Sequence, residues 1–445
     1  MPAGVLPSHA RLVRAPQRIT PIVSRFRLTG LLIFIVLALV ACRGGSTEPT
    51  PVGSGETEPA SDAVAGGSPP VASSDPAPAA VPDLESPAAV ESLSGSGPVP
   101  DVDLSITDVE LDDVVFDTFD GSFVPLSEAS TGLVESLRDA IAPVYEPFYG
   151  GADALGWLED DDLVLGYESG GRVYTYPLQI LNLRELVNDT IDGVPVLVSY
   201  CPLCASAVVY DRRLGDRTLL FGNTSALYES DLVMFDHETG SYWFQVAGRA
   251  IVGELTGEAL SVLPSTVASW GDWRALHPDA LLLVGAGAES LGNLRYARDP
   301  FEGYEQIVDS GRFAFPVSDA VRDDRLRAAE VVVVVAAGGS EKAFPSSRLE
   351  NGVNEVVGDV PVLVAPTLGG GLASAFDRRV GDQVLTFDQA GSELVDQETG
   401  TTWDRAGRAV AGALEGERLA LLPLRRAFWF AVVAAQPGIA LYDAG

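Results

Sequence analysis

One segment of this 445-residue chain occurs twice, and this repetition constrains the fold more than any other feature. Val-Pro-Val-Leu-Val stands at 194–198 and again at 360–364, and Asp-Arg-Arg at 211–213 recurs at the same spacing. Further matches keep the same order: Glu-Thr-Gly at 238–240 and 398–400, Trp243 and Trp403, Leu-Pro at 263–264 and 422–423, Trp270 and Trp429. A repeat unit of this length is a domain rather than a solenoid module, so the sequence predicts two related domains.

The repeated unit reads mostly as β-strand. Short β-branched and aromatic runs, separated by Asp-Gly, Gly-Asp and Glu-Thr-Gly turn signals, predict strands at 194–200, 207–210, 218–221, 232–235 and 242–246. Residues 178–187 and 269–276 have the best helical patterns. We therefore expect a β-rich α+β fold with two tandem related domains, at 104–290 and 291–445, of which the second is degenerate.

The first 42 residues have the pattern of a lipoprotein signal peptide. Several arginines and no acidic residue precede an apolar run at 31–41, which is too short for a comfortable membrane span. Cys42 follows Val-Ala, as in a lipobox whose cysteine is lipidated. We expect an extracytoplasmic protein that is anchored to the cell membrane through Cys42.

Residues 43–103 are rich in Pro, Ser, Gly and Ala and contain no aromatic side chain. A segment of this composition cannot bury enough apolar surface to fold, so it predicts a disordered tether. The whole chain has a formal net charge of −33, which argues against a nucleic-acid partner.

The only two cysteines after Cys42 lie in Tyr200-Cys201-Pro202-Leu203-Cys204, at the end of an apolar run. The second copy has Thr367 and Gly370 in their places. Three interpretations are open: a redox-active dithiol, half of a soft-metal site, or a structural pair that is either disulfide-bonded or buried and reduced. Because only the first copy has the thiols, any function of the pair belongs to that copy.

The metal interpretation needs further ligands. After the signal segment the only histidines are His237 and His277, so a closed zinc site with two cysteines and two histidines requires both of them. A two-thiolate Cu(I) site requires fewer ligands. Copper or zinc at Cys201 and Cys204 is the cofactor that this pattern allows.

Several polar residues surround the motif in the sequence. Asn188 and Asp189 precede the strand that leads to Cys201, and they are read as turn residues or as part of a binding site, together with Tyr200. Glu185, on the preceding predicted helix, is a further binding candidate. A third alternative is an enzyme of another kind, in which Glu185, Asp189 or Asp211 acts as the acid or base.

The motifs together resemble the DUF3179 family of bacterial and archaeal proteins. The resemblance rests on Val187-Asn188-Asp189, Tyr200-Cys201-Pro202-Leu203-Cys204, Phe221-Gly222, Ser230-Asp231-Leu232-Val233-Met234, Glu238-Thr239-Gly240-Ser241 and Trp243. It covers nearly everything after the tether and implies no established activity. Of the candidate metal ligands, the two cysteines and His277 fit the family pattern, whereas Arg184 and His237 depart from it.

The leading hypothesis is a lipid-anchored surface protein whose first domain uses Cys201 and Cys204 for thiol redox exchange or for binding a soft metal. It implies an extracytoplasmic redox or metal-handling partner. The alternative is a non-catalytic surface module with a structural disulfide and a ligand groove between the two domains.

Overall fold

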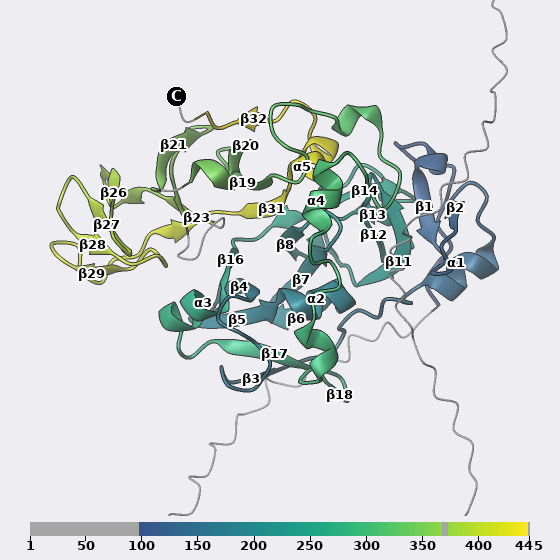
Figure 1. Cartoon of the computed structure of the whole chain (residues 1–445), viewed down its shortest axis with the longest axis horizontal. Helices are drawn as coiled ribbons and strands as arrows, with labels where there is room; N and C mark the ends of the chain where they lie inside the picture. The colour runs from purple at the N-terminus through teal and green to yellow at the C-terminus, as the bar shows by residue number, and fades with distance from the viewer. Residues whose placement is uncertain (1–97, 350, 367–372, 444–445) are drawn as a thin grey trace, which may run out of the picture. The chain divides into compact units, whose positions relative to one another are not determined.

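The computed structural model describes residues 98–349, 351–366 and 373–443 (Figure 1). The predicted signal peptide at 1–42, with Cys42, and most of the predicted tether at 43–103 lie outside the described residues, as do Thr367 and Gly370. The described chain is mostly β-sheet with a few short helices, which confirms the predicted β-rich α+β class. Within these described ranges no helix is both long and apolar enough to cross a membrane.

A short N-terminal segment precedes the first copy. Its elements are the 3-10 helix η1 (Leu111–Asp113), strands β1 (Val114–Asp117) and β2 (Phe123–Pro125), helix α1 (Thr131–Leu137) and strand β3 (Pro147–Gly150). Strand β1 joins a six-stranded sheet in the order β14-β13-β12-β11-β1-β2.

The first copy contains the remaining strands of that sheet, most strands of a second six-stranded sheet and half of the strands of an eight-stranded sheet. Its elements are β4 (Leu163–Ser169), β5 (Arg172–Pro177), α2 (Leu178–Arg184), β6 (Leu186–Ile191), β7 (Val194–Cys201), β8 (Ser206–Asp211), β9 (Arg213–Leu214), β10 (Arg217–Thr218), β11 (Phe221–Tyr228), β12 (Asp231–Asp236), β13 (Tyr242–Phe244), β14 (Arg249–Val252), β15 (Ser261–Val262), β16 (Thr266–Ser269), α3 (Trp270–Leu276), β17 (Leu281–Ala286) and β18 (Glu289–Ser290).

A connector with little regular structure leads to the second copy. It contains η2 (Leu294–Ala297), α4 (Tyr304–Asp309) and η3 (Asp319–Val321). The second copy contains β19 (Val331–Ala337), β20 (Ser340–Pro345), η4 (Ser346–Arg348), β21 (Val353–Val357), β22 (Val360–Pro366), β23 (Ala373–Asp377), β24 (Arg379–Val380), β25 (Gln383–Val384), β26 (Phe387–Ala390), β27 (Glu393–Asp396), β28 (Thr402–Trp403), β29 (Ala409–Ala411), β30 (Ala420–Leu421), β31 (Leu424–Phe428), α5 (Trp429–Ala435) and β32 (Ala440–Leu441).

The two copies have the same strand pairings. The antiparallel order β6-β7-β8-β15 recurs as β21-β22-β23-β30, and β11-β12-β13-β14 recurs as β26-β27-β28-β29. Strand β4 pairs with β5 and β16 as β19 pairs with β20 and β31. The sequence repeat is therefore also a repeat of backbone structure. Because the described residues of both copies fall in one compact unit, the division at 290/291 into separate domains stays a prediction.

The copies are joined by strands at the end of each repeat. Strand β31 of the second copy pairs with β8 of the first through Arg426 and Ala207, which makes one eight-stranded sheet from both copies (Figure 1). Reciprocally, β16 of the first copy lies beside β23 of the second, where the Thr266 and Ser374 hydroxyls are 3.0 Å apart. Pro264 and Pro423, equivalent residues of the two copies, face each other in an antiparallel bridge.

Strands β7 and β8 are buried on both faces. Side chains along a strand point alternately to opposite sides. Leu197 and Cys201 accordingly belong to one hydrophobic cluster, whereas Val198 and Tyr200 belong to another on the opposite side. The uninterrupted apolar run in the sequence therefore reflects a strand with two covered faces, and it places Tyr200 on the side away from Cys201.

Two local predictions need correction. The helix predicted at 178–187 ends earlier, at Arg184, because Leu186 already pairs with Ser199 in the ladder of β6 and β7. Asn188, which was read as a turn residue, lies inside β6 and pairs with Leu197. The turn comes later, at Asp192 and Gly193, both of which have a positive φ.

The repeated fold depends on one side-chain clamp that occurs in both copies. The Asn188 amide accepts a hydrogen bond from the Phe221 N–H and donates one to the Phe221 carbonyl, each 2.9 Å long, and Asn354 makes the same two bonds with Phe387. We expect Asn188→Ala to lower the free energy of unfolding by about 2–4 kcal/mol, because both polar groups of Phe221 lose their partner in a buried place.

The matched variant is Asn354→Ala. Asn354 is exposed, so water replaces the lost hydrogen bonds, and the expected loss is below about 1 kcal/mol. Urea unfolding of the two variants and the parent protein measures both values, and equal losses would contradict the argument from burial.

Candidate metal centre

The tight turn between β7 and β8 positions both cysteines. Cys201 ends β7 and pairs with Ser206 at the start of β8, so the chain reverses within the Cys-Pro-Leu-Cys segment. Ala205 adopts a φ of +49°, which lets the turn close directly after Cys204. The Cys204 carbonyl accepts a 2.7 Å hydrogen bond from the Phe428 N–H of β31. The second copy therefore fixes the turn that bears the thiols.

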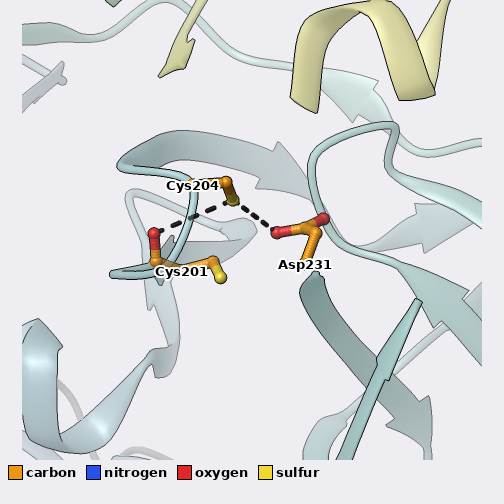
Figure 2. Close-up of side chains that lie close together, drawn as sticks. All are labelled: Cys201, Cys204 and Asp231. Carbon is orange, nitrogen blue, oxygen red and sulfur yellow. Dashed lines mark hydrogen bonds between the residues drawn. The ribbon is translucent and has the colours of Figure 1, made fainter. Parts of the chain in front are cut away.

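A carboxylate from the neighbouring sheet completes the cluster. Asp231 begins β12, directly after Glu229 and Ser230, which both have a positive φ and make the reversal from β11. The Cys204 thiol donates to Asp231 Oδ1 over 2.8 Å, and the Val246 N–H donates to Oδ2 over 2.8 Å. The side chains of Cys201, Cys204 and Asp231 converge, with their ligand atoms all within 4.8 Å of one another (Figure 2).

All three groups are buried, and burial governs their protonation. Cys201 is 1% exposed, whereas Cys204 and Asp231 are completely buried. Burial raises the pKa of both thiols and raises the pKa of Asp231 to about 6. The two sulfurs are not joined in a disulfide. Without a cation the cluster therefore holds protonated thiols around a carboxyl group whose pKa is about 6.

Glu185 is a second carboxyl group close to these thiols. It lies where α2 ends and β6 begins, with a φ of +58°, and its carboxylate accepts a hydrogen bond from the Asn223 amide. Burial raises the pKa of Glu185 to about 8, and the charge of Asp231 contributes in the same direction. Glu185 in turn raises the pKa of Cys201 through its charge. The acidic groups at this site therefore disfavour one another's ionisation.

One buried cation lies next to the cluster. Arg426, on β31, donates a 2.7 Å hydrogen bond to the Ala205 carbonyl, and its charge interacts with Cys204 and Tyr200. Burial lowers the pKa of the Arg426 guanidinium. Among the ion pairs found in the described ranges, none includes Arg426. A net negative charge at the cysteines would compensate it.

A chain of uncharged side chains supports the thiol of Cys204. Its Sγ lies 3.2 Å from the Ser206 hydroxyl, which donates to Gln245 Oε1. The Gln245 amide then donates to Ser199 Oγ over 2.8 Å. These buried hydrogen bonds hold Ser206 in place, so the environment of the sulfur is fixed before any ligand arrives.

Unusual backbone conformations gather around the same cluster. Of the non-glycine residues with a positive φ, five are buried and lie on the segments that carry the site: Glu185, Ala205, Ser225, Glu229 and Ser230. In the described part of the second copy, no non-glycine residue has a positive φ. Strained residues of this kind cluster at functional sites, so their presence in the first copy marks it as the one that carries this candidate site.

The structure brings some of the predicted site residues together and separates others. Glu185 is near the cysteines, whereas Tyr200 faces the opposite side of β7 and Asn188 clamps Phe221. Asp189 accepts a 2.7 Å hydrogen bond from the Tyr149 hydroxyl, and burial raises its pKa. Asp211 forms an ion pair with Arg213, and this structural contact explains why the two charged residues are there without a catalytic role.

His277 does not join the cysteines. It lies at the end of α3, where its ring packs against Trp273 with 4.2 Å between the ring centroids. The metal-ligand cluster in the described ranges has Asp231 as the third group beside Cys201 and Cys204. A two-cysteine, one-histidine set would require α3 to reach the turn between β7 and β8, and its packing on β4 and β16 holds it elsewhere.

Sequence reasoning missed Asp231, although the repeat contained a signal for it. The hairpin of β11 and β12 spans Phe221–Asp236, whereas the equivalent hairpin spans only Phe387–Asp396. In the first hairpin Asn223 pairs with Met234, and at the equivalent position of the second hairpin Gln389 pairs with Leu394. The residues that the second hairpin lacks are therefore those beyond this pair, at the tip, and they include the counterpart of Asp231. The second copy thus lacks the carboxylate as well as the thiols.

These features define a β-rich two-copy protein with a buried dithiol and carboxylate cluster in the first copy. The chain belongs to the family described as a protein of unknown function, DUF3179, whose model matches residues 138–438 and so covers both copies. No curated protein and no solved structure matches the chain.

The raised pKa of Glu185 predicts a pH dependence of stability for the metal-free protein. The ordinary pKa of 4.5 rises to about 8 on folding, so between these values the folded state binds the proton that the unfolded state has lost. The free energy of unfolding should therefore fall as the pH rises from about 5 to about 8, by an amount on the order of 2–4 kcal/mol.

Urea unfolding in the presence of a chelator, repeated across this pH range, measures the dependence. Glu185→Gln keeps the shape and the hydrogen-bonding capacity of the side chain but removes its titration, so the slope should become shallower. An unchanged slope in Glu185→Gln would show that other groups cause it.

Proposed function

We propose that this protein is a lipid-anchored extracytoplasmic metal-binding protein that holds one Zn²⁺ ion through Cys201, Cys204 and Asp231. The observation that carries the proposal is the convergence of two buried thiols and a buried carboxylate, with ligand atoms all within 4.8 Å of one another. Two sulfurs and an oxygen are a ligand set that zinc accepts.

The spacing of the ligand atoms supports this proposal. With bonds of about 2.3 Å to sulfur, adjacent ligands of a tetrahedral zinc ion are about 3.8 Å apart. Atoms that already lie within 4.8 Å of one another need only small side-chain movements to reach that separation. Three protein ligands leave a fourth position for a water molecule or another small ligand, as in zinc sites that react or exchange ligands.

Charge balance favours Zn²⁺ over Cu⁺. Two thiolates and one carboxylate carry three negative charges, so a divalent ion leaves a net charge of about −1 and a monovalent ion about −2. The buried guanidinium of Arg426 supplies one positive charge beside the cluster. The zinc complex together with Arg426 is then neutral, which is the favourable arrangement in a low-dielectric interior. The carboxylate is also a harder ligand than Cu⁺ prefers.

Thiol redox exchange is the weaker proposal for the same residues. Attack on a disulfide needs an accessible thiolate, and burial both hides these sulfurs and raises their pKa. The segment after Cys204 is strand β8, so no helix N-terminus is present there to stabilise a thiolate. The short distance between two free thiols nevertheless permits a disulfide, which makes the redox state a necessary control.

Zinc binding can be measured on the purified protein with Cys42→Ser in every sample, so that only Cys201 and Cys204 supply thiols. We expect one Zn²⁺ per chain by metal analysis, with release of protons as the thiols ionise. Cobalt substitution should give a thiolate-to-metal charge-transfer band. Cys204→Ser should weaken zinc binding by at least about 100-fold, and Asp231→Asn by about 10-fold or more.

Ser206→Ala is the matched control, because this residue touches the Cys204 sulfur without being in the ligand set. It should keep the stoichiometry and the cobalt spectrum. A folded parent protein that binds no metal under reducing conditions, or metal that remains when both cysteines are replaced, would overturn the zinc site. A reversible dithiol transition in such a metal-free protein would favour redox exchange instead.

The anchor is a separate part of the proposal and rests on the sequence pattern around Cys42. Cys42→Ser should abolish labelling of the protein by a radioactive fatty acid and should move it from the membrane fraction into the soluble fraction, because each buried methylene group contributes about 0.8 kcal/mol to membrane binding. Unchanged membrane association in this variant would contradict lipidation.

A further inference from the structure

A second candidate site lies where the two copies meet, at the junction of β16 and β23. A cavity of about 130 Å³ opens there between α3 and β16 of the first copy and β23 of the second. Its polar and aromatic lining includes Glu168, Asp272, Trp273, His277, Phe376 and Arg405. A cavity of this size accommodates a molecule about as large as benzene.

The cavity exists because the repeat is imperfect. Alignment of Pro264 with Pro423 and of Trp270 with Trp429 makes Thr266 the counterpart of Arg425. At the reciprocal junction Arg425 is a large side chain that donates to the Val246 carbonyl. At the junction of β16 and β23 the much smaller Thr266 only reaches the Ser374 hydroxyl. The space that an arginine occupies on one side is therefore left open on the other.

Two hydrogen-bonding atoms that line this cavity lack partners. His277 is 5% exposed, and its Nε2 atom, although buried, has no hydrogen bond within the described part of the chain. The same is true of Asp272 Oδ2. An unpaired buried polar group destabilises the fold by about 1–3 kcal/mol, so such groups are retained where a ligand or water pairs with them.

The arrangement of these atoms selects a hydrogen-bond donor. His277 Nε2 lies 3.9 Å from Glu168 Oε1, too far for a direct hydrogen bond. One ligand nitrogen about 2.9 Å from both atoms would see them about 85° apart, so each of two ammonium N–H bonds would bend by roughly 12° from linearity, which hydrogen bonds tolerate. Burial together with the charge of Arg408 lowers the pKa of His277 to about 4, which keeps its ring neutral and able to accept.

The carboxylates of the lining favour a cation over an anion. Glu168 and Asp272 supply carboxylates to the lining. Glu168 Oε2 accepts a 3.1 Å hydrogen bond from Arg418, so Oε1, which faces His277, is the oxygen left for a ligand. The single lining cation, Arg405, donates instead to the backbone carbonyls of Ser392, Pro366 and Gly391. Trp273 and Phe376 add aromatic surface, which attracts organic cations.

We propose that this cavity binds a small organic ammonium ion, whose nitrogen bridges His277 Nε2 and Glu168 while its apolar part contacts Trp273 and Phe376. The site lies on residues that the zinc proposal does not use, so either proposal can fail without the other. The chemistry identifies the ligand as an amine with at least two N–H donors attached to a group of about benzene size.

The probe is benzylammonium, and benzyl alcohol is the neutral comparison of nearly the same shape. Titration of the full-length protein, followed by calorimetry and by the ring signals of its few histidines, should show saturable binding of benzylammonium with a shift of the His277 signal. His277→Gln identifies that signal; it introduces the residue found at the equivalent position, Gln436.

Glu168→Gln should weaken benzylammonium binding by at least about tenfold and leave the weak binding of benzyl alcohol unchanged, because only the charge-assisted bond is lost. Gln436→Ala, at the equivalent end of α5, should leave both affinities unchanged. Equal affinity for the two probes in the parent protein would overturn the proposal. So would absence of benzylammonium binding at millimolar concentration in the folded protein, which would mean that the cavity holds water only.

Discussion

The pairing of β31 with β8 is the interaction on which the site depends. A strand that ends the second copy completes the sheet of the first, and in doing so it brings Arg426 and Phe428 to the cysteine turn. Without β31, β8 would have a free edge beside Cys204, and the carbonyls of Cys204 and Ala205 would lose these partners. The copy that lacks the thiols thus helps to bury them and places a guanidinium beside their turn.

Burial in turn determines what the cluster can do. In water two thiols and a carboxylate would be an oxidisable, exchangeable group, but a covered site makes their ionised forms unfavourable unless a cation is present. The same low-dielectric surroundings that hold the thiols protonated would strengthen a metal complex once the protons leave. They would also strengthen the interaction between the charge of Arg426 and the charge of that complex. The proposed affinity for a metal and the low reactivity expected of the buried thiols would then both follow from one packing arrangement.

The repeat made much of the fold predictable, because matched residues in the same order imply matched elements. Strands β7, β8 and β12 and helix α3 lie where periodicity and turn signals indicated. The predicted helix at 178–187 is longer than α2, because the pairing of Leu186 with Ser199 in the sheet overrides the local apolar pattern. The pairing of strands between the copies could not be predicted from the sequence. The segments of β16 and β31 have the pattern of ordinary strands, and this pattern does not reveal which strand each one pairs with.

The two junctions between the copies differ in ways that produce two different candidate sites on one scaffold. Duplication makes them equivalent, with β31 beside β8 at one and β16 beside β23 at the other. Loss of a hairpin tip removed the counterpart of Asp231 in the second copy, and a threonine in place of an arginine opened the cavity at Thr266. Paired scaffold residues such as Asn188 and Asn354 kept the backbones alike while these positions diverged. The differences between the copies, rather than their shared residues, are therefore where function is to be sought in this chain.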